Sequence, residues 1–265
     1  MAKVKRRAHF LRATLAIARN AIGEALHRII FQVILLFGVL LVVGGSFFTY
    51  MAPAEEHKML TDLGLSIIAA FGMMLAIFMG VMALQPEIER RTIYALLAKP
   101  VRRWEFVVGK YVGALAVLLV SVTVMGAVFM TMLYVREGNF YAEMAEAIGT
   151  TFLGLGVMLA LAMMISTFCS TLITVIAGVV LWIMGYMQSY LGDVFAQHAE
   201  SGLLRAFIGV LGVVLPNFDK FDLRMQVVDQ VRIDPSMVHS MFWYGLEYTA
   251  VVLVLAIIFF NEKQV

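Results

Sequence analysis

The chain has 265 residues, of which 62% are apolar and 14% are charged, whereas a soluble domain has about 45–50% apolar and about 25% charged residues. Its 20 Lys and Arg nearly balance its 18 Asp and Glu, so no overall basic field favours nucleic acid. These values exclude a soluble enzyme and a DNA-binding protein. The single cysteine, Cys169, excludes an intrachain disulfide framework and a metal site of several thiolates.

The first 28 residues form a basic segment with a helical pattern. Apolar residues recur at steps of three and four from Phe10 to Leu26, and seven residues of the segment are Lys or Arg. The pattern predicts an amphipathic elbow helix at the membrane surface that leads into the first span. The alternative is a helix packed on a soluble partner. The apolar run that follows is too long for a secretory signal, whose apolar region has about 7–15 residues.

Six apolar segments are long enough to cross a bilayer as helices, which takes about 20 residues. Glu247 is the only Asp, Glu, Lys or Arg inside them, and they lack the alternation of apolar and polar residues that a β-barrel needs. The expected fold class is an all-α integral membrane protein with six transmembrane helices. We expect a single transmembrane domain over residues 1–265, with spans at about 29–49, 65–85, 111–134, 147–167, 171–191 and 243–260.

Basic residues in the connections predict the orientation, because Lys and Arg are retained on the cytoplasmic side. Segments 1–28 and 86–110 hold seven and six of them, whereas segments 50–64 and 135–146 hold one each. We therefore expect a multi-pass protein of the inner (plasma) membrane with both termini in the cytoplasm. The long connection 192–242 is then outside, and Tyr and Trp residues gather at the predicted outer ends, as is typical of an interfacial belt.

The connection between the second and third spans has the pattern of two short helices. Pro86 suits a first helical position, and Glu87 and Glu89 follow in the turn where the helix dipole favours acids. Lys99-Pro100 breaks the run, and a second short helix is expected from about Arg102 to Lys110. Together they predict a compact cytoplasmic knob that a partner can push.

The connection 192–242 holds an apolar run that is too short to cross the membrane. Leu203 to Leu215 covers 13 residues, so a re-entrant or surface helix is expected there. Pro216 and Asn217 end this helix, and the stretch 219–234, where acids and bases alternate, is expected to be solvated. The candidates for an outer gate or a substrate path are Leu215, Pro216, Asn217, Phe218 and Glu247. The alternative for Glu247 is a solvated acid at the headgroup level.

No nucleotide-binding or catalytic motif is present in the sequence. The only Gly-Lys pair, Gly109-Lys110, is followed by Tyr111 and lacks the earlier Gly of a phosphate-binding loop. HExxH and GxSxG motifs are absent as well. The 19 Met residues suggest a thioether path for copper(I), but Met also fills gaps between helices, and we adopt that interpretation. We therefore expect neither enzymatic activity nor a cofactor or metal in this chain.

The segment from Glu87 to Lys110 resembles the cytoplasmic loop between spans two and three of type-2 ABC transporter permeases, especially the NosY-like permeases. In that family an acid, a basic residue or Gly before Thr, a Leu-Leu pair, Pro, Arg, Glu and Gly-Lys follow in order. Arg91 stands where many members have Gly. The segment Leu215–Phe218 resembles a proline-containing element that these permeases often carry after span five. The residues that the resemblance assigns to ATPase coupling are Glu87, Glu89, Arg90, Arg91, Thr92, Leu96, Leu97, Lys99, Pro100, Arg103, Glu105, Gly109 and Lys110.

The resemblance implies the permease subunit of an ABC transporter. Such a subunit pairs with a second permease copy, identical or related, and its knob docks in a groove of an ABC ATPase subunit. ATP and Mg would then bind the ATPase and not this chain. An external acceptor protein is a further candidate partner, at the outer connection. The alternative function is a non-transporting membrane anchor or assembly scaffold for a larger membrane complex.

Overall fold

The computed structural model describes residues 17–20, 22–24, 29–48, 56–89, 103–139, 141–198 and 215–262. The regular elements within these ranges are all helical. They are α2 (Ile29–Phe48), α3 (Glu56–Glu89), α5 (Arg103–Glu137), α6 (Ala142–Ser166), α7 (Thr171–His198), the short 3-10 helix η3 (Asp219–Phe221), α9 (Arg224–Val228) and α10 (Pro235–Glu262).

The predicted fold class, an all-α integral membrane protein, is confirmed. By length and composition, five of the described helices, α3, α5, α6, α7 and α10, can cross a membrane. Helix α2 holds a shorter apolar stretch, Phe31–Gly44. Residues 17–20 and 22–24 are helical, as the elbow pattern predicts, and the rest of segment 1–28 lies outside the described residues.

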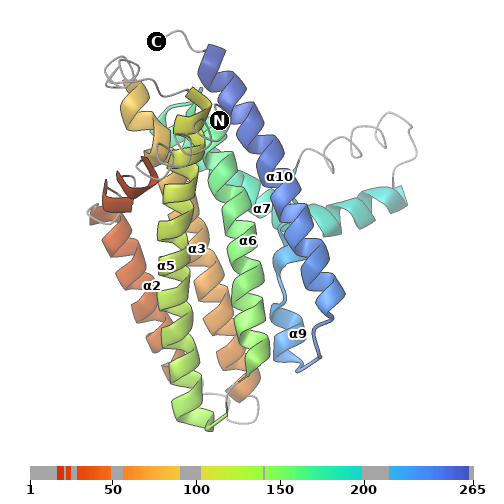
Figure 1. Cartoon of the computed structure of the whole chain (residues 1–265). Coiled ribbons are helices and arrows are strands. Elements are labelled where there is room, and N and C mark those ends of the chain that lie inside the picture. Colours follow the sequence, from red (N-terminus) through yellow and green to blue (C-terminus); the bar gives the residue numbers. More distant parts are fainter. Residues whose placement is uncertain are drawn as a thin grey trace, which may run out of the picture.

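The long helices form a bundle in which α2, α3, α5 and α6 run side by side (Figure 1). Helix α10 packs on α6 and α5, and α7 packs on α3 and α6 before its C-terminal half projects from the bundle. Helix α5 ends and α6 begins at the lower end of the view. We name this the outer end, and the opposite one the inner end, after the predicted orientation.

Helices α3 and α6 make the most extensive contact between the described elements. Gly80 of α3 permits this closeness, because a Cβ atom there would lie 2.5 Å from the Cβ of Ala162 and 2.9 Å from the carbonyl oxygen of Leu159. The second of these neighbours is backbone and cannot turn aside. The small-residue contact therefore sets the distance between the two helices.

Replacing Gly80 with alanine should destabilise the protein by about 1–3 kcal/mol, since overpacking forces two backbones apart. The matched control is Gly149→Ala in α6, where a Cβ atom would meet nothing within 4 Å. Thermal unfolding in detergent should therefore show a lower midpoint for Gly80→Ala alone. Equal midpoints for the two variants would contradict the close contact of α3 with α6.

Helix α3 does not end where the sequence pattern ends the second span. It continues through Pro86 to Glu89, so the prediction that Pro86 begins a new short helix is wrong. Proline fixes φ near the helical value, and its cost is a missing N–H and a local kink. Packed neighbours compensate for that cost within a membrane bundle, and Leu84 and Gln85 just before it are buried.

Helix α5 likewise runs without a break from Arg103 to Glu137. The predicted second short helix from Arg102 to Lys110 is therefore the start of this long helix and not a separate element. No proline stands between Arg103 and the span, and the glycine in this part, Gly109, is buried. Nothing in the local sequence ends the helix before it enters the bundle.

Contacts of His57 connect the start of α3 to the end of α5 and to the residue before α6 at the outer end. His57 Nδ1, at the start of α3, donates to both carboxylate oxygens of Glu137 at 2.8 Å, and Glu137 is the last residue of α5. The His57 ring also lies 4.9 Å from that of Tyr141, which directly precedes α6. These contacts connect residues about 80 positions apart, which periodicity in the sequence does not reveal.

Helix α10 begins with a local capping arrangement. The Asp234 carboxylate accepts a hydrogen bond from the Ser236 N–H at 3.0 Å, and this backbone bond lowers the pKa of Asp234. Pro235 takes the first helical position, where its missing N–H costs nothing. The sequence Asp-Pro-Ser thus sets where α10 starts and where the outer connection ends.

Candidate functional site

The predicted coupling residues that the structure describes lie at the inner end, in the last turn of α3 and the first turns of α5. Glu87 and Glu89 lie in the last turn of α3, and their side chains lie outside the described part of the structure. Arg103, Glu105, Gly109 and Lys110 lie in the first turns of α5. The remaining coupling candidates fall outside the described residues, namely Arg90, Arg91, Thr92, Leu96, Leu97, Lys99 and Pro100.

The described coupling candidates on α5 face the protein more than its surroundings. Glu105 is 8% exposed and Lys110 is 4% exposed, and Gly109 is buried. A buried charge requires a partner within the protein. These two charged side chains are therefore suited to holding the inner end together, whereas a docking surface needs charges that an incoming protein can reach.

The contacts of Lys110 join α5 to the elbow. Its Nζ atom lies 3.5 Å from Glu24 Oε2, and it also lies over the Phe106 ring, 5.7 Å from the ring centre. A cation over an aromatic face is attracted by the negative face of the ring quadrupole. Glu24 was not among the predicted site residues, because a partner 86 positions away leaves no local pattern.

Helix α10 supports the same end of α5. The Phe106 and Phe260 rings are stacked with 6.1 Å between their centres. Arg103 Nη1 donates to the Asn261 carbonyl oxygen at 3.3 Å, where the last carbonyls of α10 have no partner within the helix. A basic side chain is also favourable at the negative end of the helix dipole. The inner start of α5 is thus held by the elbow and by α10.

A second group of candidates lies at the outer end, in the segment that connects α7 to α10. We call residues 215–228 the outer cap; they include η3 and α9. Of the candidates named above, Leu215, Pro216 and Phe218 are buried and Asn217 is partly buried. Glu247 is exposed on α10, so the structure does not gather it with the buried candidates. The predicted re-entrant or surface helix lies outside the described residues, apart from its last residue, Leu215.

Glycines on three helices receive the aromatic side chains of the outer cap. A Cβ atom at Gly185 of α7 would overlap the Phe218 ring and lie 2.6 Å from the Pro216 carbonyl oxygen. Cβ atoms at Gly154 of α6 and Gly245 of α10 would each lie 3.2 Å from the Phe221 ring. Phe218 and Phe221 therefore pack directly against the helix backbone at these glycines.

Backbone and cation contacts add to this seating. The Phe218 N–H donates to the Gly185 carbonyl oxygen at 3.2 Å, and the Asn217 N–H donates to Tyr244 Oη at 3.0 Å. Lys220 Nζ lies 4.6 Å from the centre of the Tyr244 ring. The outer cap is thus attached to both α7 and α10, the long helices that precede and follow it in the chain.

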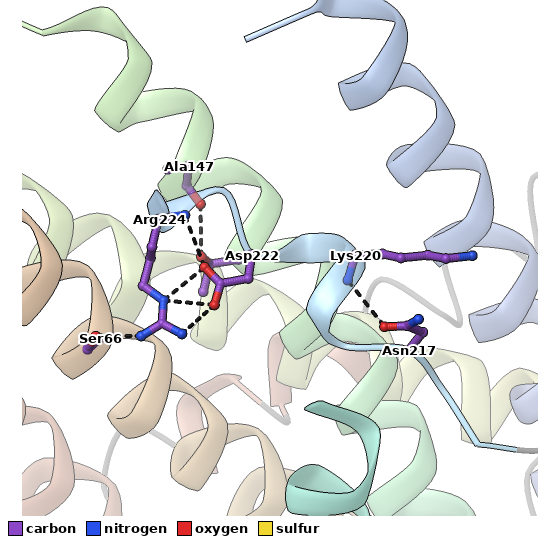
Figure 2. A network of polar contacts seen from close by, with 7 residues as sticks. Ser66, Ala147, Asn217, Lys220, Asp222 and Arg224 are labelled. Carbon is purple, nitrogen blue, oxygen red and sulfur yellow. Dashed lines mark hydrogen bonds and ion pairs between the residues drawn. The ribbon is translucent and has the colours of Figure 1, made fainter. Parts of the chain in front are cut away.

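An ion-pair network attaches the outer cap to α3 (Figure 2). Arg224 Nε lies 2.8 Å from both carboxylate oxygens of Asp222, and Arg224 Nη1 donates to Ser66 Oγ at 2.5 Å. The hydrogen bond to Asp222 raises the pKa of Arg224 above its ordinary value. Arg224 therefore stays charged, and its guanidinium is held in one orientation toward α3.

The prediction that the stretch 219–234 is solvated is wrong for part of it. Phe221, Leu223, Val227 and Ile233 are buried, and they belong to the same apolar core as the long helices. The charged residues of this stretch are exposed or partly buried, while the four apolar residues named above pack into the core. Apolar residues between the charges were the signal that could have indicated burial.

A small cavity lies directly under the outer cap. Its walls come from Ala69 and Met73 of α3, Gly154 and Leu155 of α6, and Phe218 and Phe221 of the cap, with Thr151 and Tyr186 also lining it. Most of this lining is apolar. Among the described residues there is no group of His, Cys, Asp and Glu that could hold a metal ion.

The comparison with protein families decides the assignment. Residues 17–265 match the model of the ABC-2 family transporter protein. The chain belongs to the ABC-2 transporter family. This confirms the resemblance at family level, and the NosY-like subgroup stays a prediction. A search of curated proteins gives no match.

Membership explains the general plan of this ABC-2 protein. Members are generally non-catalytic, multi-pass membrane subunits of ABC transporters, and an ABC ATPase is their general partner. The match spans both groups of candidate residues, from the elbow to the end of α10.

Proposed function

We propose that this chain is the permease subunit of an ATP-driven transporter and couples ATP hydrolysis in a separate ATPase subunit to movement of a substrate across the membrane. The observation that carries the proposal is the family match over residues 17–265. The ordered motif from Glu89 to Lys110 lies within that range. In this proposal ATP and Mg bind the ATPase, and the permease works as a dimer with an identical or related copy.

The helices on both sides of the coupling segment suit a mechanical role. Helix α3 has 34 residues and is therefore about 51 Å long, so a displacement at its inner end reaches its outer end. Helix α5 is equally continuous over 35 residues. When ATPase subunits close on ATP, they would displace the segment between α3 and α5 and tilt these two helices together.

The contacts of Lys110 support this proposal. They tie the elbow to the helix that receives the force, while Arg103 and Phe106 tie α10 to it. A push on the coupling segment would then move the elbow, α5 and the inner end of α10 as one body. The expected orientation places these parts in the cytoplasm of the cell and the outer cap outside it.

Reversing the charges of Glu89 and Arg91 together should weaken association with the ATPase or uncouple ATP hydrolysis from transport. One exposed ion pair contributes only about 0–1 kcal/mol, so a single alanine is too mild a change. The measurement is the amount of ATPase subunit, and of ATP hydrolysis, that elutes with the full-length permease in mild detergent.

The matched control reverses another pair at the opposite end, Lys58 and Asp229. Their side chains are 3.0 Å apart and both are exposed, so the control changes charge without touching the coupling segment. Normal association and coupling in the Glu89 and Arg91 double variant would show that these charges do not couple the ATPase. Absence of any ATPase and of ATP hydrolysis from the unaltered complex would favour the membrane scaffold instead.

A further inference from the structure

A buried amide at the inner end connects two parts of the chain that are 84 positions apart. Gln85 of α3 is 5% exposed, and its Nε2 donates a hydrogen bond to the Cys169 carbonyl oxygen at 3.3 Å. Cys169 belongs to the short connection between α6 and α7, residues 167–170, which we call the α6–α7 turn. Gln85 was not among the predicted site residues, because the family motif begins after it.

The Cys169 carbonyl lies just outside the hydrogen-bond ladder of α7. The Ser170 carbonyl accepts from the Thr174 N–H at 2.9 Å and so opens that ladder. The carbonyl one residue earlier receives its donor from the side chain of Gln85. The turn is also braced from within, because the N–H groups of Phe168 and Cys169 both donate to the Ile165 carbonyl. A displacement of the Cys169 carbonyl therefore carries the turn with it.

Apolar packing holds the helices beside this turn more firmly than the turn itself. Helix α3 meets α6 at Gly80, where an added Cβ atom would lie 2.5 Å from that of Ala162. In the turn, by contrast, Phe168 is 53% exposed and Ser170 is exposed as well. The stability of the bundle therefore does not depend on the hydrogen bond from Gln85, whereas the position of the turn does.

The Gln85 amide has a cost in stability that packing does not explain. Its Oε1 is buried and has no hydrogen-bond partner among the described residues. A buried polar atom without a partner costs as much free energy as one neutral hydrogen bond contributes, or more. A leucine of similar size would avoid that cost. A local choice that reduces stability in this way is typical of a functional position.

The position of Gln85 along α3 indicates what this function is. Pro86 follows directly and lacks the N–H that would hold the last turn of the helix, so α3 bends most easily at this point. The coupling segment begins where α3 ends, at Glu89. A displacement of that segment therefore moves the Gln85 amide, and the Cys169 carbonyl is its hydrogen-bond partner.

We propose that Gln85 is a positioning residue that joins the end of α3 to the α6–α7 turn, so that the turn moves with the coupling segment. This inference rests on the proposed function, in which an ATPase displaces that segment. The turn leads directly into α7, and the Phe168 ring contacts the Phe259 ring of α10 with 5.6 Å between their centres. Helices α7 and α10 are much less buried than α3 and α6, so they can shift with less loss of packing.

The first measurement uses the thiol of Cys169, the only cysteine of the chain, and needs no ATPase. The full chain in lipid nanodiscs is treated with a small maleimide, and modification of Cys169 is followed by mass spectrometry, with Cys169→Ser as the background. Gln85→Leu should raise the rate about fivefold, as expected for one lost neutral hydrogen bond. It should leave the thermal unfolding midpoint unchanged or raise it, because the unpaired oxygen disappears as well.

The matched control is Gln226→Leu at the opposite end of the bundle. Gln226 Oε1 is likewise buried without a partner among the described residues, and its Nε2 donates to Met237 Sδ at 3.6 Å. This variant should leave the Cys169 rate unchanged. If Gln85→Leu does not fold, Gln85→Met removes the same donor with an unbranched side chain. Equal Cys169 rates with and without Gln85, or a lower midpoint for Gln85→Leu, would overturn the inference.

The second measurement repeats the labelling on the complex with its co-purified ATPase, with and without ATP, Mg and vanadate. The unaltered complex should give two different Cys169 rates, whereas Gln85→Leu should still bind the ATPase but give one rate. ATP hydrolysis without a change at Cys169, or the same change in Gln85→Leu, would overturn the inference and leave the proposed function standing. If no ATPase elutes with the chain, the proposed function fails instead, and the first measurement still decides whether Gln85 positions the turn.

Discussion

Replacing Phe221 with alanine should lower the free energy of unfolding by about 3–5 kcal/mol, the usual cost of removing a fully packed phenylalanine. The Phe221 side chain is 3% exposed. It fills the space between Gly154 and Gly245 and lies 5.7 Å from the Tyr244 ring. Neither glycine has a side chain that can move into the vacated space, so a cavity should remain.

The matched control is Met225→Ala, four residues further along in the same cap. Met225 is 72% exposed, and its removal should change the unfolding midpoint very little. Thermal unfolding of the purified full chain in detergent measures both variants. A similar small effect for Phe221→Ala would mean that the aromatic ring does not seat between α6 and α10.

A comparably large effect is expected where α3 crosses α5. Phe129 is fully buried, and its ring occupies the space beside Gly64, where an added Cβ atom would overlap the ring. Phe129→Ala should therefore destabilise the protein by about 3–5 kcal/mol. Gly64→Ala should destabilise it by about 1–3 kcal/mol, because the Phe129 ring must shift in a packed core.

Combining the two substitutions should change the sign of the second effect. Once Phe129 is alanine, the methyl group of Gly64→Ala enters vacated space and gains up to about 1 kcal/mol from the higher helix propensity of alanine. The double-mutant cycle is measured by unfolding in detergent, and we expect a strong coupling between the two sites. Simple additivity would contradict the contact between Gly64 and the Phe129 ring.

The coupling candidates on α5 illustrate what a motif can and cannot indicate. The order of Arg103, Glu105, Gly109 and Lys110 indicates the family, and the family match agrees with it. It does not indicate that Glu105 and Lys110 are buried, because the burial of Lys110 depends on Phe106 of its own helix and on Glu24 of the elbow. Those residues meet only when α5 and the elbow pack.

The sequence by itself determined the class and the general plan of this protein. Long uncharged runs indicate membrane spans and exclude a soluble fold. The spans are helices because a lipid-exposed backbone must satisfy its own hydrogen bonds. Charges and prolines in the connections then indicate where the helices turn, although α3 passes through Pro86. That exception arises because packing along a long helix compensates for one missing backbone hydrogen bond.

Tertiary structure alone decided which side chains meet at the two ends of the bundle. Ser66 and Arg224 are 158 positions apart, and Phe221 reaches glycines on two other helices. A glycine in an apolar run looks the same in the sequence whether it receives an aromatic ring or faces open space, as Gly154 and Gly149 do. Such contacts depend on the distances and rotations between helices, which the periodicity of a single segment does not contain.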